Sequence, residues 1–243
     1  MKRYNAFADF YDDIWTGIKG DTKFYLQEAK KARGPVLEAA CGTGRIMLPL
    51  LEAGVDIDGF DITPKMISVL KKKAKAKGLK PNVWVADMRS FRSKRKYGLI
   101  IVPYRSFLHI RTTEDQIKTL KNFKRHLKKG GRLVMNFFYP DFNFMAKNDG
   151  KTSKKHPIYI KGKKYYSQEK VSISPIEQFN TVQWTLTGQG KTRKYSIDIC
   201  YIYKKEFDLL LSAAGFRKWK VYGGFKKEKL TKMQQEMVWI IRN

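Results

Sequence analysis

The 243-residue chain has too few cysteines and histidines to suggest a disulfide framework or a metal centre. Its two cysteines, Cys41 and Cys200, lie far apart, and its three histidines show none of the short spacings of a metal site. No apolar run approaches the roughly 20 residues that a membrane-spanning helix needs. The first residues also lack the apolar segment of a signal peptide. These absences predict a cytoplasmic protein that binds neither a metal nor a membrane.

Acidic residues are scarce beside basic ones. The chain has 22 Asp and Glu against 50 Lys and Arg, which gives a net charge of +28. Hyperthermophile surfaces gain Lys and Glu together, so heat adaptation alone does not explain this excess. Two interpretations stay open: an acidic partner such as nucleic acid or a phosphorylated substrate, or lysine-rich faces that only meet solvent.

The central feature of the sequence is a short apolar run that ends in a tight glycine turn, over residues 36–45. Gly42 and Gly44 allow positive φ angles and let a ligand approach the backbone. Helical spacing follows, so the segment predicts a strand, a turn and a helix start whose free amides face a ligand. A dinucleotide site would need a third glycine where Met47 stands. Glu38, at the strand end, also suits a cationic group, such as a methionyl amino group, better than a pyrophosphate.

Strands and helices alternate regularly from residue 36 to residue 138. Such alternation predicts a parallel sheet with right-handed crossovers, which binds its ligands at the carboxyl ends of the strands. N-terminal helices are expected within residues 4–33. The expected strands cover residues 36–40, 55–60, 82–86, 97–102 and 132–138, and the helices between them cover residues 45–53, 65–77 and 112–129, with Thr63 as a cap and Gly130-Gly131 as a helix end.

Polar residues stand at successive strand ends. Asp61 ends the second strand, where an acid can accept both ribose hydroxyls of a nucleoside; its alternative role is to cap the next helix. Asp87 follows the third strand, where a carboxylate can accept from the exocyclic amine of adenine. Tyr104 and His109 follow the fourth strand.

The pattern changes after residue 140. A lysine-rich stretch precedes a period-two alternation over residues 165–203, which turns at residues 188–190 and predicts an inserted antiparallel sheet. A helix over residues 204–214 and strands over residues 216–222 and 237–241 follow. These last strands would form an antiparallel hairpin at the edge of the main sheet.

Four segments together resemble the successive motifs of the class I S-adenosylmethionine-dependent methyltransferases: residues 37–45, 59–66, 86–89 and 127–133. The chain is similar to small-molecule enzymes with a β insertion, namely sugar N,N-dimethyltransferases and, more distantly, glycine and sarcosine N-methyltransferases. The resemblance implies an α/β, Rossmann-like, mostly parallel seven-stranded sheet with helices on both faces. It also implies four units: N-terminal lid helices (1–33), a cofactor-binding core (34–145), the antiparallel insertion after strand 5 (146–203), and a C-terminal helix with the last two strands (204–243).

The resemblance implies S-adenosylmethionine as the cofactor. Glu38 would hold the methionyl amino group, Asp61 the ribose, and Asp87 with Met88 the adenine. Tyr11 belongs to an aromatic stripe; its ring would either face the sulfonium or pack in the core. The full set of expected cofactor contacts is Tyr11, Glu38, Ala40, Gly42, Gly44, Asp61, Ile62, Asp87, Met88 and Val102.

Methyl transfer is an in-line displacement, so the protein must bring a nucleophile to about 3–3.5 Å in a dry pocket. A base is needed only when that nucleophile starts protonated. His109 and Tyr104 are the candidate catalytic residues, and Arg105 is the candidate substrate contact, for a carboxylate or phosphate. The alternative role of His109 is a hydrogen bond at a helix start. The sequence Val102-Pro103-Tyr104 lacks the Asp/Asn-Pro-Pro-Tyr motif of base-amine methyltransferases.

The sequence therefore predicts a methyltransferase that acts on a nitrogen or oxygen of a small molecule. Anionic small molecules would be one class of acceptor. We expect a monomer or a homodimer. An RNA methyltransferase that grips phosphates with its basic surface is the first alternative. A binding protein that keeps the cofactor site without turnover is the second.

Overall fold

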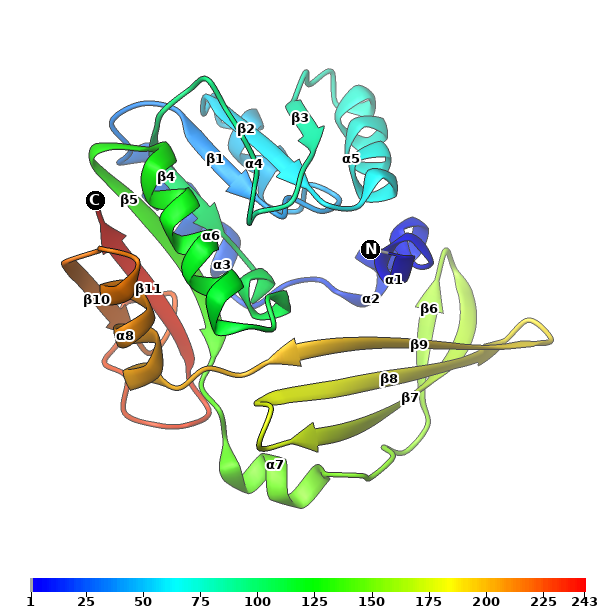
Figure 1. Cartoon of the computed structure of the whole chain (residues 1–243). Helices are drawn as coiled ribbons and strands as arrows, with labels where there is room; N and C mark the ends of the chain where they lie inside the picture. The colour runs from blue at the N-terminus through cyan, green and yellow to red at the C-terminus, as the bar shows by residue number, and fades with distance from the viewer. Residues whose placement is uncertain (1) are drawn as a thin grey trace.

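The computed structural model describes residues 2–243, with side chains from residue 4 onward. Met1, part of the expected lid segment, lies outside the described residues. Two sheets organise the chain (Figure 1). The seven-stranded sheet has the order β10-β11-β5-β4-β1-β2-β3, with β1 Val36–Ala39, β2 Ile57–Asp61, β3 Asn82–Val85, β4 Tyr97–Val102, β5 Leu127–Phe138, β10 Lys218–Tyr222 and β11 Glu236–Arg242.

The four-stranded sheet has the order β6-β7-β8-β9. Its strands are β6 His156–Ile160, β7 Lys163–Ser174, β8 Phe179–Gly188 and β9 Lys191–Cys200. The helices are α1 Lys2–Asn5, η1 Ala8–Phe10, α2 Tyr11–Ile14, α3 Asp21–Lys30, α4 Met47–Glu52, α5 Pro64–Ala76, η2 Ser106–His109, α6 Thr113–His126, α7 Phe142–Asn148 and α8 Lys204–Ala213.

Alternation along the central strands builds one hydrophobic layer on each face of the large sheet. On β4, Leu99 and Ile101 pack with α3, α4 and α5, whereas Ile100 and Val102 pack with α6 and α8. The first five strands are parallel, and β11 and β10 close the sheet as an antiparallel pair. The expected α/β fold is confirmed. Because β1, β2, β3 and β4 run in parallel, their carboxyl ends meet at one edge.

The four-stranded sheet is built from antiparallel hairpins with tight turns. The turns at Lys161-Gly162 and Gln189-Gly190 each place two consecutive residues at positive φ, as a two-residue type I′ turn requires. The inserted sheet is therefore present, but it begins at His156 rather than at residue 165. The lysine-rich stretch makes β6 hard to recognise in the sequence, because its lysines occupy the turn and exposed positions around the strand. The alternation of β6 itself comes from Ile158 and Ile160.

The N-terminal segment, residues 2–15, lies between the two sheets (Figure 1). It forms short helical pieces rather than one continuous helix. Its aromatic rings pack against the four-stranded sheet, with ring centroids 5.5 Å apart for Trp15 and Trp184. Its acids face α5: Asp9 pairs with Lys65 at 2.5 Å, and Asp12 with Lys73 at 2.8 Å. The segment therefore joins the two sheets.

The expected helix end at Gly130-Gly131 is wrong, whereas Thr63 does occupy the N-cap position of α5 with Pro64 after it. α6 ends at His126, and Gly130 and Gly131 lie inside β5, where the pairing with β4 shifts register. Gly130 has a φ of +74°, and a Cβ on Gly131 would stand 3.0 Å from the carbonyl oxygen of Tyr97, so the glycines serve this bulge and not a helix end. Thr63 precedes α5 but makes no side-chain capping bond to it.

Phe7 should decide whether the N-terminal segment stays docked. Its side chain is 1% exposed and packs edge-on against the ring of Tyr195 at 5.6 Å. Phe7→Ala removes a packed ring, a change that costs about 3–5 kcal/mol in a core. We expect the loss to appear as faster hydrogen exchange and proteolysis within residues 2–15, with the large sheet still protected. Phe144→Ala, at an exposed ring, is the matched control. Unchanged protection of the segment in Phe7→Ala would contradict this assignment.

Candidate active site

The turn after β1 leaves room for a ligand at one glycine and closes tightly at the next. Ala40, Gly42 and Gly44 have φ angles of +59°, +53° and +86°. A Cβ on Gly42 would meet no atom within 4 Å, whereas one on Gly44 would stand 2.8 Å from Leu70 Cγ. Gly42 therefore borders open space, and Gly44 allows α5 to approach the turn. Ala40 carries a Cβ, so its left-handed conformation costs about 1–2 kcal/mol.

Glu38 carries a buried carboxylate at the end of β1. Its side chain is 3% exposed, and within the described part of the chain its Oε2 finds no hydrogen-bond partner. Burial raises the pKa of Glu38; Arg45 opposes this shift, and Asp61 and Asp21 add to it. A buried acceptor without a donor is unfavourable, so this oxygen fits a cationic group of a ligand.

Arg45 stands beside Glu38 and is itself firmly held. Its guanidinium makes two bonds to Asp21, at 2.9 Å from Nη1 and 2.7 Å from Nη2, and lies 5.1 Å from the ring centroid of Tyr104. A carboxylate and a guanidinium therefore face the same region. An amino-acid tail, which has both an ammonium and a carboxylate, matches this pair.

Asp61, at the end of β2, ties the two ligand-facing turns together. One carboxylate oxygen accepts from the Gly42 amide at 2.9 Å and the other from the Thr63 amide at 2.8 Å. Burial raises the pKa of Asp61, and these hydrogen bonds oppose the rise. Because each oxygen has two lone pairs, the carboxylate can still accept two neighbouring hydroxyls. Asp61 can therefore hold the start of α5 through the Thr63 amide and still accept hydrogen bonds from a ligand.

The third strand end is more occupied than the first two. Asp87 accepts hydrogen bonds from the Arg89 guanidinium, at 2.6 Å from Nη2, and from the Arg89 amide at 2.8 Å. Burial alone would raise its pKa, but the bonds to Arg89 outweigh burial and lower it. Met88 and Ile62 are partly buried. Val102 is fully buried in the core.

Strained backbone follows the fourth strand. Tyr104 and Arg105 both adopt left-handed φ angles, +54° and +65°. Asn136 on β5 holds them: its Oδ1 accepts from the Tyr104 amide at 3.0 Å and from the Tyr25 hydroxyl at 2.7 Å, and its carbonyl accepts from the Arg105 amide at 3.1 Å. Such strain costs about 1–3 kcal/mol per residue and gathers at functional sites. Sequence analysis missed Asn136, although it is the polar residue within the apolar run of residues 133–138.

The side chain of Arg105 is directed to Glu236 rather than to the other candidates. Its Nε and Nη2 donate to the two carboxylate oxygens at 3.1 and 2.8 Å. The Asn136 amide donates to the same carboxylate at 2.7 Å. Arg105 is therefore engaged with Glu236 through Nε and Nη2, which leaves Nη1 outside this contact.

His109 forms a pair with Tyr4, which sequence analysis did not single out. The Tyr4 hydroxyl lies 2.8 Å from Nε2, and Nδ1 lies 3.3 Å from the Asp198 carbonyl oxygen. A carbonyl can only accept, so Nδ1 carries the proton and Nε2 accepts from Tyr4. Desolvation lowers the pKa of His109, although the residue keeps exposed surface. The His109 ring therefore has protein on most sides and solvent on the side that remains exposed.

Tyr4 connects His109 with the residues near the strand ends. Its ring lies 6.4 Å from that of Tyr11. Burial raises the pKa of Tyr4, and the neighbouring Tyr11, Asp61 and Tyr104 raise it further. The structure thus gathers most candidates at one edge of the sheet. The only signal for Tyr4 in the sequence is its place in the aromatic series before Tyr11.

Residues 2–243 contain no group of three or more His, Cys, Asp or Glu side chains arranged to hold a metal ion. None of the helices has both the length and the apolarity that crossing a membrane requires.

Comparison with known proteins agrees with this geometry. A family model described as a methyltransferase domain matches residues 36–131. The glycine/sarcosine N-methyltransferase of Halorhodospira halochloris is 28% identical over 229 residues, which are 91% of this chain and 81% of that protein. The dTDP-3-amino-3,4,6-trideoxy-alpha-D-glucopyranose N,N-dimethyltransferase of Streptomyces venezuelae is 24% identical over 238 residues, 89% of this chain and 92% of that protein.

Other similarities differ in extent. The match to the YqeM protein of Bacillus subtilis, at 28% identity, covers 55% of this chain and about half of that protein, 54%. Among solved structures, the CcbJ methyltransferase of Streptomyces caelestis aligns with a TM-score of 0.81 at 21% identity, over 97% of this chain and 95% of that chain. At this identity the structural likeness shows the fold.

The buried carboxylate of Glu38 should lower the stability of the ligand-free protein at neutral pH. Its folded pKa is raised above the unfolded value of about 4.3, so stability falls as the pH rises from the unfolded towards the folded pKa. Glu38→Gln removes this loss. We expect its Tm to exceed that of the native chain by roughly 2–4 °C at pH 7–8, or about 1 kcal/mol, and the difference to vanish near pH 4. Glu177→Gln, at an exposed position, is the control. A lower Tm of Glu38→Gln at pH 7 would show that Glu38 has a partner.

Proposed function

We infer that this class I S-adenosylmethionine-dependent methyltransferase transfers a methyl group to the amine nitrogen of a small-molecule acceptor. The observation that carries the proposal is the Glu38 carboxylate, which has an oxygen without a donor, stands beside Arg45 and lies one strand from Asp61. Asp61 in turn raises the pKa of Tyr4, which bonds to His109. The relatives reported above are named for N-methylation of glycine, sarcosine and an amino sugar. An oxygen acceptor is the alternative on the same site.

The residues of this chain fit the cofactor. Glu38 would bind the methionyl ammonium, Arg45 its carboxylate, and Asp61 the ribose hydroxyls. At the third strand end, Asp87 would bind the adenine amine with the lone pairs that Arg89 leaves free. Bound there, S-adenosylmethionine supplies a methyl group already activated on a cationic sulfur. Residues 1–33 would act as the lid, with the ring of Tyr11 over that sulfur.

The Tyr4–His109 pair would remove a proton from the acceptor. Most amines are protonated at neutral pH and must lose a proton before nitrogen can attack carbon. In the proposed step, the Tyr4 hydroxyl takes the acceptor proton while its own proton passes to His109 Nε2. The Asp198 carbonyl, which accepts from Nδ1, then stabilises the imidazolium. Tyr104 would line the opposite wall, and Nη1 of Arg105 is the expected contact for an anionic acceptor.

The basic surface has a structural use that does not need RNA. Lys65 and Lys73 on α5 pair with Asp9 and Asp12 of the N-terminal segment. These pairs hold the segment over the site. We therefore expect RNA binding to be weak and to fall steeply with salt.

Glu38→Ala and Asp61→Ala should each weaken S-adenosylmethionine binding by about 1.5–3 kcal/mol, roughly ten- to a hundredfold, because each removes a charge-assisted contact. Calorimetric titration measures the change. Asp56→Ala, which removes an exposed carboxylate just before β2, is the matched control. NAD should not bind. Unchanged cofactor affinity in both variants, or tight NAD binding, would overturn the cofactor assignment.

His109→Gln and Tyr4→Phe should lower kcat by about 10²- to 10⁴-fold, the usual contribution of a general base. The cofactor Kd should stay within about twofold. Because the pKa of His109 is lowered from 6.5, turnover by the native chain should be flat above about pH 7 and fall in acid. His109→Gln should lose that acid limb. A native rate in both variants would show that the acceptor needs no base.

The acceptor class is tested by methyl transfer from labelled S-adenosylmethionine to separate pools of small amines, hydroxylated metabolites and RNA. We expect label in the small-amine pool, with His109→Gln as the blank. Label confined to RNA that survives near-physiological salt would replace this proposal with the RNA alternative.

A further inference from the structure

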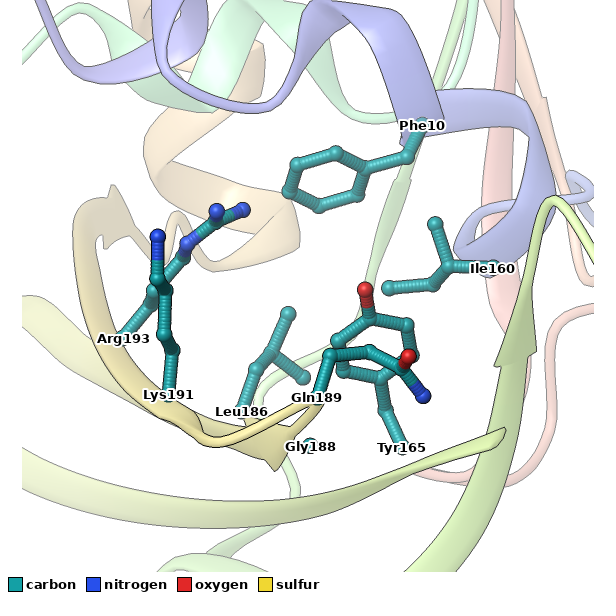
Figure 2. Close-up of a pocket in the computed structure, with 8 residues that line it drawn as sticks. All are labelled: Phe10, Ile160, Tyr165, Leu186, Gly188, Gln189, Lys191 and Arg193. Carbon is teal, nitrogen blue, oxygen red and sulfur yellow. The ribbon is translucent and has the colours of Figure 1, made fainter. Parts of the chain in front are cut away.

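A small pocket lies on the inner face of the four-stranded sheet, at the end formed by the β8–β9 turn (Figure 2). Its volume is about 50 Å³. Leu186 and Ile160 are buried along its apolar side, and Phe10 of the N-terminal segment lies opposite them. The pocket is thus formed only when the N-terminal segment is docked on the sheet.

Two cationic side chains stand together in this pocket. Lys191 and Arg193 are two residues apart on β9, so both point to the inner face, and Figure 2 shows them side by side. Both side chains are exposed, and among the residues that the structure describes neither forms an ion pair with a carboxylate. Two adjacent like charges without a counter-charge favour an anion between them.

One further polar group in the wall adds a hydrogen-bond donor. Figure 2 shows the Tyr165 hydroxyl across the pocket from the two cations, whereas the Gln189 amide points away from them. None of the lining residues is an Asp or Glu. A cavity needs roughly 10–15 Å³ of volume measured in this way to hold one water, so the pocket accepts a group larger than one water. A carboxylate or phosphate group accepts hydrogen bonds from Lys, Arg and Tyr side chains.

The backbone beneath the pocket has a defined geometry. The two-residue turn at Gln189-Gly190 fixes the start of β9, and Leu186 pairs directly with Arg193 across the strands.

We propose that this pocket binds a small oxyanion, a carboxylate or a phosphate group. It is distinct from the methyl-transfer site: five residues of β9 separate Arg193 from Asp198, whose carbonyl contacts His109, a path of roughly 16 Å. The packed cluster that contains Phe7, Trp184 and Ile197 belongs to the same inner face. The bound oxyanion is therefore a free ion or the charged end of a molecule that extends into solvent.

Binding at this place also stabilises the N-terminal segment. Phe10 forms one wall of the pocket and contacts the ring of Tyr195 at 6.0 Å, and the next residue is Tyr11 of the cofactor side. An occupant that bridges β9 and Phe10 slows opening of the segment by mass action on its docked state.

The test titrates the full chain, without cofactor, with inorganic phosphate, acetate and glycerol phosphate at constant ionic strength, and follows backbone NMR shifts. We expect saturable shifts in residues 186–193 and at Phe10. Arg193→Gln and Lys191→Gln should each weaken binding by about tenfold. Lys194→Gln removes the same charge from the opposite face of β9 and should change affinity less than twofold.

The three probes separate the sources of the oxyanion. Tighter binding of glycerol phosphate than of inorganic phosphate supports the charged end of a larger molecule, and the reverse order supports a free ion. Protease protection of residues 2–15 should rise with the same midpoint as the NMR shifts. Shifts that do not saturate, or an equal loss of affinity in Lys194→Gln and Arg193→Gln, would overturn the proposal, because either result means non-specific attraction to a basic protein.

Discussion

A carboxylate buried at the end of β1, with one oxygen left without a donor, is the constraint on which the cofactor side of this protein depends. Glu38 can remain there because Arg45 places a positive charge nearby, and Arg45 is in turn fixed by its two bonds to Asp21. The arrangement is unfavourable for the empty protein and favourable for a ligand that carries an ammonium beside a carboxylate. A ligand ammonium would supply the partner that the Glu38 carboxylate lacks, and this contact would contribute to the binding energy.

The backbone around this carboxylate is shaped to leave space. Three positive φ angles within five residues turn the chain away from β1. The two glycines have different tasks: Gly42 faces open space, and Gly44 makes room for Leu70 of α5. The same kind of strain recurs after β4, where Asn136 holds Tyr104 and Arg105 in left-handed conformations. In both places hydrogen bonds or close packing maintain a conformation that the local sequence does not favour.

The N-terminal segment connects the cofactor side, the acceptor side and the inserted sheet. Its rings pack on Trp184 and Tyr195, its acids pair with the lysines of α5, and Tyr4 reaches His109. One short segment therefore contributes to the proposed lid, to the proposed base and to the wall of the proposed oxyanion pocket.

Local pattern was sufficient for the order of the elements and for the cofactor motifs. Buried parallel strands are continuous apolar runs, and a ligand-binding turn requires glycines at fixed positions, so both are visible along a single stretch of chain. The fold class, the inserted sheet and the place of Glu38 and Asp61 at strand ends follow from such patterns. Boundaries failed where a residue type serves two purposes, as with the glycines of the β5 bulge and the lysines that hide β6.

Only the tertiary structure decided which side chains meet. Tyr4 and His109 are 105 residues apart, and Arg105 and Glu236 are 131 residues apart. No periodicity predicts such pairs, because they depend on how the N-terminal segment and the closing strand β11 pack beside the loop after β4. Packing across the fold also decides three other features: the pairing of Arg105 with Glu236, the contacts of Asn136, and the position of the two cations of β9 away from any carboxylate partner among the described residues. Sequence patterns record local geometry and burial, whereas long-range partners are chosen by packing across the whole fold.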